Sequence, residues 1–247
     1  MMIYITRPSP EGDKLTQQLN QANIPATHLP LFKILAGHGL NSLQQQLNQL
    51  APSDIVIVVS PQVSYMIKEH QPNLSFPKHL RYFAIGKKSA QLFSQQADVH
   101  VDYPNEEHSE GLLPLLTDLQ GRSVLILCGN NGRQLLSQEL QQKANVTSIQ
   151  CYFRQPIQYP ANILTDDIAQ QILLVTSVDH LLQLDTYCQN KHKYEAQLVV
   201  TSPRIFEKAK QLKWHNVLQI VSANNEFLFK TMITLCHNAE NISQKSK

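Results

Sequence analysis

The chain has 247 residues, a mass of 28.1 kDa, 42% apolar residues and a formal net charge of +2. This apolar content excludes a disordered chain, and the small net charge argues against a protein that neutralises many nucleic-acid phosphates. The length suits one large or two small domains, and no apolar run is long enough to cross a bilayer, so we expect neither nucleic acid nor a membrane as partner.

The N-terminus and the cysteines indicate where the protein works. Residues 1–7 read as a β-strand and lack the basic region and apolar block of a signal peptide, so we expect a cytoplasmic protein. Four cysteines fall into no C-x-x-C pair and no zinc pattern, which favours buried free thiols and no metal site. They are Cys128, Cys151, Cys188 and Cys236.

Short β-rich runs alternate with segments of helical apolar spacing, which is typical of βα units around a parallel sheet. Stripes such as Leu40, Leu43 and Leu47 recur at helical spacing and predict core-facing helices. The predicted strands are Ile3–Thr6, Thr27–Leu29, Leu31–Leu35, Ile55–Val59, Arg81–Ile85, Val99–Val101, Ser123–Leu127, Thr147–Phe153, Ile172–Val175, Gln197–Val200 and Val217–Val221.

Eleven strands exceed the usual size of one sheet and therefore predict two smaller sheets. Leu31–Leu35 follows another strand after a single proline, and Thr147–Phe153 runs into a proline-containing loop, so both suit a linker better than a parallel core. The polar segment from Asn238 onward lacks an apolar face, and we predict that residues 241–247 form a disordered tail.

Small polar or glycine residues follow six of the strands and lead into helices. In a parallel sheet such turns lie at the carboxyl ends of the strands, where backbone N–H groups suit carboxylates or phosphates. The same residues are also ordinary helix caps, so each turn alone keeps both readings open. The six turns are Arg7–Gly12, Ser60–Gln62, Gly86–Ser89, Gly129–Arg133, Thr176–Ser177 and Thr201–Arg204.

Nucleotide-binding loops are absent from these turns. The run from Gly129 to Gly132 lacks the spacing of a dinucleotide fingerprint, and no Lys-Ser or Lys-Thr pair follows it. A nucleotide-dependent enzyme is therefore disfavoured, while another anionic small molecule stays open.

A set of short motifs, in order along the chain, resembles the uroporphyrinogen-III synthase family. The resemblance runs from residue 3 to about residue 235, and its specificity comes from the order of motifs that are individually weak. The motifs are Thr6-Arg7-Pro8, Pro30-Leu31-Phe32-Lys33-Ile34, Ala84-Ile85-Gly86, Ser109-Glu110-Gly111-Leu112-Leu113, Val124-Leu125-Ile126-Leu127, Gly129-x-x-Gly132-Arg133, Tyr152-x-Arg154, Thr176-Ser177 and Ser202-Pro203-Arg204-Ile205.

The resemblance implies an α/β fold of two parallel-sheet, flavodoxin-like, three-layer domains joined by a two-stranded β-ladder linker. Residues 1–30 and 157–240 would form a discontinuous first domain, and residues 37–147 the second. Residues 31–36 and 148–156 would be the connector strands, with the working site in the cleft between the domains.

The resemblance also implies a reaction: the linear tetrapyrrole hydroxymethylbilane closes to uroporphyrinogen III with loss of water and inversion of ring D through a spiro intermediate. The family uses no cofactor and no metal. We expect a monomer that makes a transient contact with hydroxymethylbilane synthase. The alternative from another class is a non-catalytic two-domain clamp for an anionic metabolite, which the same helix-start donors would serve.

For the site, the resemblance implies that Tyr152 is the candidate general acid, with a structural strand tyrosine as the equal alternative. Arg154 could flank the cleft or be an exposed linker charge. For each serine, helix capping is the competing role. The expected substrate-binding residues are Arg7, Ser60, Gly86, Ser89, Ser109, Gly129, Gly132, Arg133, Ser177, Ser202 and Arg204.

Overall fold

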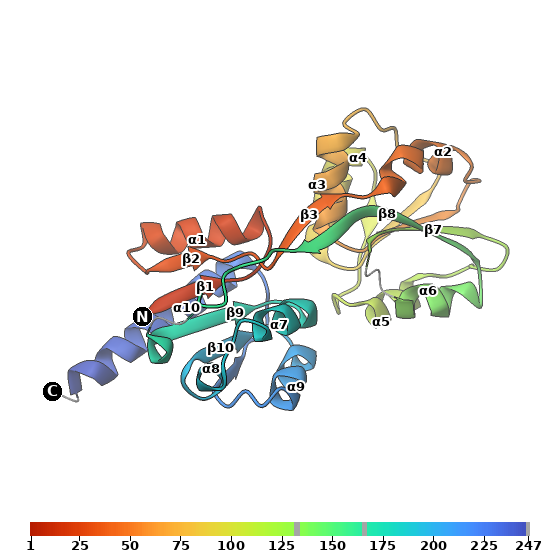
Figure 1. Ribbon diagram of the computed structural model, residues 1–247. Coiled ribbons are helices and arrows are strands. Elements are labelled where there is room, and N and C mark those ends of the chain that lie inside the picture. The colour runs from red at the N-terminus through yellow and green to blue at the C-terminus, as the bar shows by residue number, and fades with distance from the viewer. Residues whose placement is uncertain (131–133, 165–166, 246–247) are drawn as a thin grey trace. The chain divides into compact units, whose positions relative to one another are not determined.

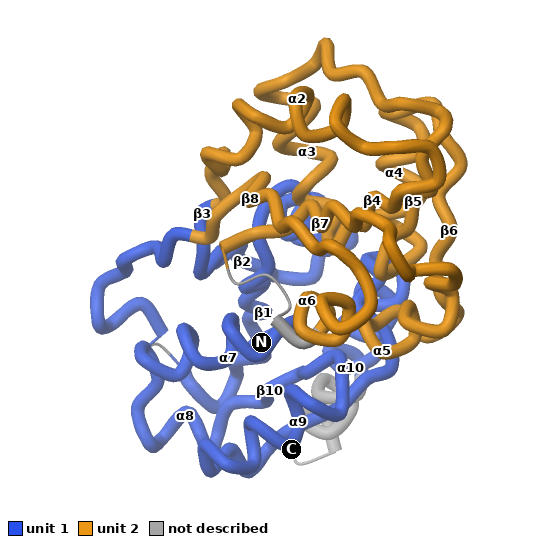
Figure 2. The backbone as a smooth tube through the Cα atoms, turned by 90° about the vertical axis from the view of Figure 1, so that its right-hand side faces the viewer, with its two compact units in different colours: residues 1–33, 155–247 blue, residues 34–154 orange. Residues whose placement is uncertain are grey.

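The computed structural model describes residues 1–130, 134–164 and 167–245. The chain divides into two compact units, coloured separately in Figure 2: unit 1 is residues 1–33 and 155–247, and unit 2 is residues 34–154. All eleven predicted strands are confirmed within the described residues, with ends that shift by a few positions.

Unit 1 is built on a five-stranded sheet in which neighbouring strands are parallel (Figure 1). The strand order is β11-β10-β9-β1-β2. Counted along the chain within this unit, the order is 2-1-3-4-5, the doubly wound arrangement of flavodoxin-like proteins. The strands are β1 (Met2–Ile5), β2 (Ala26–His28), β9 (Gln171–Val175), β10 (Gln197–Val200) and β11 (Val217–Gln219).

Successive side chains of the unit 1 strands enter opposite cores, which makes this unit three-layered. Ile172 and Leu174 of β9 pack with α1 and α10, whereas Leu173 and Val175 pack with α7 and α9 on the other face. Strands buried on both faces read as continuous apolar runs, as this one does. The helices are α1 (Glu11–Gln21), α7 (Val178–Asp185), α8 (Asn190–Glu195), α9 (Pro203–Gln211) and α10 (Asn225–Lys245).

Unit 2 carries a six-stranded sheet with the order β3-β8-β7-β4-β5-β6. Strands β4 to β8 of this sheet pair in parallel. Counted along the chain from β4, their order is 3-2-1-4-5, which is a related doubly wound arrangement. The strands are β3 (Phe32–Ala36), β4 (Ile55–Val58), β5 (Arg81–Ala84), β6 (Val101–Asp102), β7 (Ser123–Gly129) and β8 (Asn145–Pro156).

The unit 2 sheet also separates two cores. Val56 and Val58 of β4 face the core that includes α2, α3 and α4, while Ile55 and Ile57 face the core that includes α5 and α6. The helices are α2 (Leu43–Asn48), α3 (Pro61–His70), α4 (Lys87–Ala97), α5 (Ser109–Leu112) and α6 (Gln134–Gln141), with 3-10 turns at His38–Ser42 and Leu113–Leu115. The predicted class, parallel three-layer α/β, is confirmed for both units.

One strand departs from its predicted role. β8 neighbours β3, as a connector ladder requires, but residues 145–152 also pair in parallel with β7 inside the sheet of unit 2. The expectation that Thr147–Phe153 is a linker strand outside the parallel core was therefore wrong. The reason is that α6 precedes β8, so that β7, α6 and β8 form an ordinary crossover unit.

Helix α10 is the last described element, and the disordered tail over residues 241–247 stays a prediction. Helix α10 continues to Lys245, and residues 246–247 lie outside the described part of the chain. No glycine or proline interrupts the sequence from Asn225 to Lys245, so nothing in the backbone preference ends the helix at its last apolar turn.

Candidate functional site

Ligands of doubly wound sheets bind beyond the carboxyl ends of the strands, at the point where the strand order reverses. In unit 1 this point lies between β1 and β9, which are followed by Arg7 and Ser177. In unit 2 it lies between β4 and β7, which are followed by Ser60 and Asn130. The topology therefore gathers predicted site residues at the switch point of each sheet.

The predicted serines of unit 1 are helix caps. Ser177 Oγ accepts a hydrogen bond from the His180 N–H at 3.1 Å, and Ser202 Oγ accepts one from the Ile205 N–H at 3.4 Å. Each hydroxyl keeps its own proton, which it can donate to an anion while its oxygen caps the helix. Capping and binding are thus compatible at both positions.

The side chain of Arg7 is hydrogen-bonded within unit 1. Its Nη1 donates to the backbone oxygen of Ala223 at 2.9 Å and to Asn225 Oδ1 at 2.6 Å, and Asn225 Nδ2 donates to the Glu11 oxygen at 3.0 Å. These bonds tie the turn after β1 to the start of α10. Arg204, also predicted to bind substrate, is an exposed residue in the first turn of α9.

Two of the helix starts predicted in unit 2 differ from each other. Ser60 caps α3, because its Oγ accepts a hydrogen bond from the Gln62 N–H at 3.3 Å. At the start of α4 the Lys87 N–H donates to Glu107 Oε2 at 3.0 Å, and a Cβ on Gly86 would collide with the same carboxylate. Sequence reasoning missed Glu107, which lies 20 residues away in an exposed loop.

Two further predicted donors of unit 2 lie inside the protein. Ser89 is 4% exposed in the first turn of α4, on the face that carries Ala90 and Phe93 into the core, and Ser109 is 2% exposed at the first position of α5. Both serine side chains are therefore almost completely covered by the rest of the protein, as Tyr152 is at 2% exposure. Helical spacing, which turns every third or fourth residue inward, accounts for the burial of Ser89.

The carboxyl end of β7 brings Gly129 against Tyr152. The pairing of β7 with β8 shifts register between Cys128 and Gly129, so that Gly129 lies opposite Tyr152. The ring of Tyr152 lies where a Cβ of residue 129 would be, and Tyr152 is 2% exposed. The predicted Gly132 and Arg133 lie outside the described residues.

Arg154, which the sequence pointed to, lies beside Tyr152 and pairs with Asn130, which sequence reasoning did not identify. The Arg154 N–H donates to Asn130 Oδ1 at 3.0 Å, and the Arg154 side chain lies over the phenol, with Cζ 5.6 Å from the ring centroid. Arg154 Nη2 donates to Tyr152 Oη at 3.4 Å. The spacing Tyr152-x-Arg154 could have indicated this, because residues two apart on a strand share a face.

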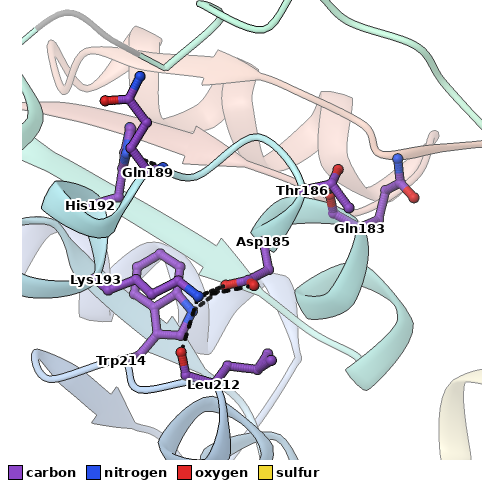
Figure 3. Close-up of polar contacts among 8 residues, drawn as sticks. All are labelled: Gln183, Asp185, Thr186, Gln189, His192, Lys193, Leu212 and Trp214. Carbon is purple, nitrogen blue, oxygen red and sulfur yellow. Dashed lines mark hydrogen bonds and ion pairs between the residues drawn. The ribbon is translucent and has the colours of Figure 1, made fainter.

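Unit 1 holds a second polar cluster, whose side chains are drawn in Figure 3. The Asp185 carboxylate accepts hydrogen bonds from Lys193 Nζ at 3.1 Å and from Trp214 Nε1 at 3.0 Å, and Lys193 also donates to the Leu212 oxygen. These residues end α7, occupy α8 and precede β11, so they lie where the chain enters the strands. The cluster is a structural tie between helices.

Other kinds of site find little support in the described part of the chain. There, no group of three or more His, Cys, Asp or Glu side chains could hold a metal ion, and no helix is long and apolar enough to span a membrane. A hollow of about 360 Å³ is lined by Asp118, Gln120, Gly121 and Arg122. It precedes β7, at the amino edge of the strand, and contains none of the predicted site residues.

Comparisons with known proteins agree on one family. A family model described as uroporphyrinogen-III synthase HemD matches residues 13–229. The uroporphyrinogen-III synthase of Escherichia coli K12 is 31% identical over 245 residues, covering 94% of this chain and 100% of that protein. The enzyme of Proteus mirabilis is 39% identical over 165 residues, covering 64% of this chain and 83% of that protein.

Solved structures support the fold. A mutant uroporphyrinogen III synthase from Thermus thermophilus has a TM-score of 0.67 at 14% identity, covering 97% of this chain and 98% of that one. Uroporphyrinogen-III synthetase from Helicobacter pylori 26695 has a TM-score of 0.62 at 14% identity, covering 95% and 98%.

Fold and site together define a protein of two doubly wound α/β units with hydrogen-bond donors at the carboxyl edges of both sheets. The match of the family model over most of the chain, and the full-length match to the Escherichia coli enzyme, make the assignment specific. The chain belongs to the uroporphyrinogen-III synthase family.

Proposed function

We propose that this protein is a cyclising hydro-lyase that converts hydroxymethylbilane to uroporphyrinogen III. The observation that carries the proposal is the similarity to the Escherichia coli enzyme over that protein's whole length. The alternative, a non-catalytic clamp for an anionic metabolite, is not favoured, because the relatives that match are named as synthases. A cytoplasmic location, a monomeric state and a transient contact with hydroxymethylbilane synthase stay predictions.

The proposed chemistry needs few reacting groups. The ring A hydroxyl accepts a proton and leaves as water, and the resulting azafulvene cation is attacked by the substituted carbon of ring D. The spiro intermediate then fragments and recloses with ring D inverted. The proton lost when the last pyrrole regains aromaticity balances the proton given to the hydroxyl, so no cofactor is consumed.

Binding of the substrate is proposed to use donors at the carboxyl edges of the sheets. An octa-carboxylate requires many donors, and backbone N–H groups at helix starts, together with the hydroxyls of Ser60, Ser177 and Ser202, supply them. Because these donors are fixed by the sheets, they can hold a flexible substrate in one reactive conformation and so favour one carbon over another.

We assign proton donation to Tyr152. Its oxygen accepts the contact from Arg154 Nη2, so the phenol proton is not used in that contact, although the residue is only 2% exposed and the substrate must reach it to accept the proton. The ring is fixed against Gly129 by packing, so its oxygen has a defined position. A group that gives a proton in the transition state must be placed with this kind of precision.

The experiment is a coupled assay in which porphobilinogen and its deaminase generate hydroxymethylbilane in the presence of the purified protein. We expect isomer III of uroporphyrin after oxidation, without added metal or nucleotide. Isomer I alone, from protein that is folded by circular dichroism, would contradict the proposed activity. Binding of the tetrapyrrole without any isomer III would instead support the clamp.

A further inference from the structure

Arg154 is placed by the end of the neighbouring strand. β7 ends at Gly129, and the side chain of the next residue, Asn130, continues the ladder. Its Oδ1 accepts from the Arg154 N–H at 3.0 Å, and its Nδ2 donates to the Arg154 oxygen at 3.5 Å. One amide side chain therefore pairs with both backbone groups of Arg154, as a further strand residue would.

The register shift makes this arrangement possible. Cys128 pairs with Gln150, but Gly129 pairs with Tyr152, so β8 contains one residue more than β7 at this point. Such a bulge turns the following side chains relative to the regular ladder. After it, Tyr152 and Arg154 lie on one face, and the guanidinium covers the phenol with Cζ 5.6 Å from the ring centroid.

We propose that Arg154, held by Asn130, is a positioning residue that aims the Tyr152 hydroxyl for proton donation. This inference rests on the proposed role of Tyr152. Arg154 Nη2 donates to Tyr152 Oη, which occupies one side of the oxygen and directs its proton away from the guanidinium. A cation that donates to the oxygen also polarises the O–H bond, so the phenol becomes a stronger donor to the leaving hydroxyl.

A double-mutant cycle tests the proposal, with isomer III formation measured for the wild type, Arg154→Gln, Tyr152→Phe and the double variant. We expect Arg154→Gln to lower kcat about tenfold when Tyr152 is present, the factor for loss of one modest transition-state interaction. In the Tyr152→Phe background the same change should alter kcat less than about twofold, because the hydroxyl that it acts on is gone.

Two conservative variants separate a loss of positioning from a loss of folding. Arg154→Lys keeps the charge without the planar fork and should restore only part of kcat. Asn130→Asp keeps the acceptor for the Arg154 N–H and should retain more activity than Asn130→Ala. The thermal midpoint of each variant is followed by circular dichroism, and kcat is compared only among variants that are folded at the assay temperature.

Arg81 provides the matched control in the same unit. Its guanidinium covers the Phe83 ring with Cζ 5.3 Å from the centroid, and its Nη1 donates to the Thr117 oxygen at 3.0 Å, but it begins β5 at the amino edge of the sheet. Arg81→Gln should leave kcat unchanged, whatever it does to stability.

The outcomes separate this inference from the function on which it rests. Equal losses from Arg154→Gln in both backgrounds would overturn the positioning role and leave Tyr152 as proton donor. A normal kcat for Tyr152→Phe would overturn both assignments. Absence of isomer III from the wild type would overturn the proposed activity itself.

Discussion

The ring of Tyr152 occupies the space that a side chain at residue 129 would need: a Cβ there would lie 2.6 Å from Cζ of the tyrosine, far inside van der Waals contact. A glycine at the end of β7 is therefore a condition for the position of the phenol. The ring is fully packed in the unit 2 core, so it has little freedom to move aside.

Replacement of this glycine by alanine tests the contact. Gly129→Ala should lower the free energy of unfolding by about 1–3 kcal/mol, the usual cost of overpacking, and should also lower kcat because the phenol moves. Urea denaturation and the isomer III assay measure the two effects. Gly121→Ala is the control for an effect on stability alone. Its φ of +74° disfavours any side chain, so it should destabilise the protein and leave kcat unchanged. Unchanged stability and kcat for Gly129→Ala would show that the ring is not fixed by this contact.

The division of catalysis among residues gives a second prediction. Tyr152→Phe keeps the packed ring and removes the proton donor, so kcat should fall by up to about 10²–10⁴-fold without vanishing. Ser202→Ala should cost about 1 kcal/mol of stability as a lost helix cap, with a smaller loss of activity because neighbouring N–H donors remain. Initial rates decide: abolished activity in Ser202→Ala beside a near-normal Tyr152→Phe would indicate a serine nucleophile.

Glu107 leads to a prediction about substrate affinity. Its carboxylate already accepts the Lys87 N–H at the start of α4, where a substrate carboxylate is expected to bind. Glu107→Ala should lower KM about two- to fivefold, in keeping with the modest free energy of an anion at an exposed helix start. Glu110→Ala serves as the neighbouring acidic control. An unchanged KM for Glu107→Ala would show that substrate does not use this helix start.

The polar cluster of unit 1 should act on stability and not on activity. Asp185 is 20% exposed, and its loss leaves Lys193 and the indole N–H of Trp214 without their shared acceptor, so Asp185→Ala should destabilise by roughly 1–3 kcal/mol. Trp214 is the only tryptophan, and its fluorescence reports urea unfolding directly. The exposed pair of Lys78 and Asp98 is the control: Lys78→Ala should have no measurable effect. Similar midpoints for both variants would contradict the assignment.

Burial, and secondarily the nearby Asp185 carboxylate, raise the pKa of the Cys188 thiol to about 12 from an ordinary value of 9.0. The folded protein therefore keeps this proton between about pH 9 and 12 while the unfolded chain loses it. Stability is unaffected by this group below pH 9 and falls as the pH rises through that window. Cys188→Ser should show a shallower loss of stability there.

Alkylation with iodoacetamide, followed by mass spectrometry, measures the same pKa. Labelling of Cys188 in the folded protein should be slow at pH 8 and accelerate toward pH 12, because the thiolate is the reactive form. In urea the acceleration should come near pH 9. Rapid labelling of the folded protein at pH 8 would show that the thiol is neither buried nor raised in pKa.

Much of the fold follows from local patterns. Ile55–Val58 and Ile172–Val175 are continuous apolar runs of strand length, and both are buried on the two faces of their sheets. Such a run predicts a central strand from its own residues alone. The serines at helix starts were predicted as caps or donors, and Ser60, Ser177 and Ser202 do cap their helices. Such features depend on neighbours within a few residues, which a sequence displays directly.

Only the tertiary structure decided the rest. The parallel pairing of β8 with β7, the burial of Ser109, the carboxylate of Glu107 at α4, and the hold of Asn130 on Arg154 each depend on residues 20 or more positions apart or on which face a short element presents. Nothing in local preference specifies these contacts, because they arise when sheets and helices pack. The sequence by itself determined the strands, the caps and the family; packing determined which of the candidate side chains meet.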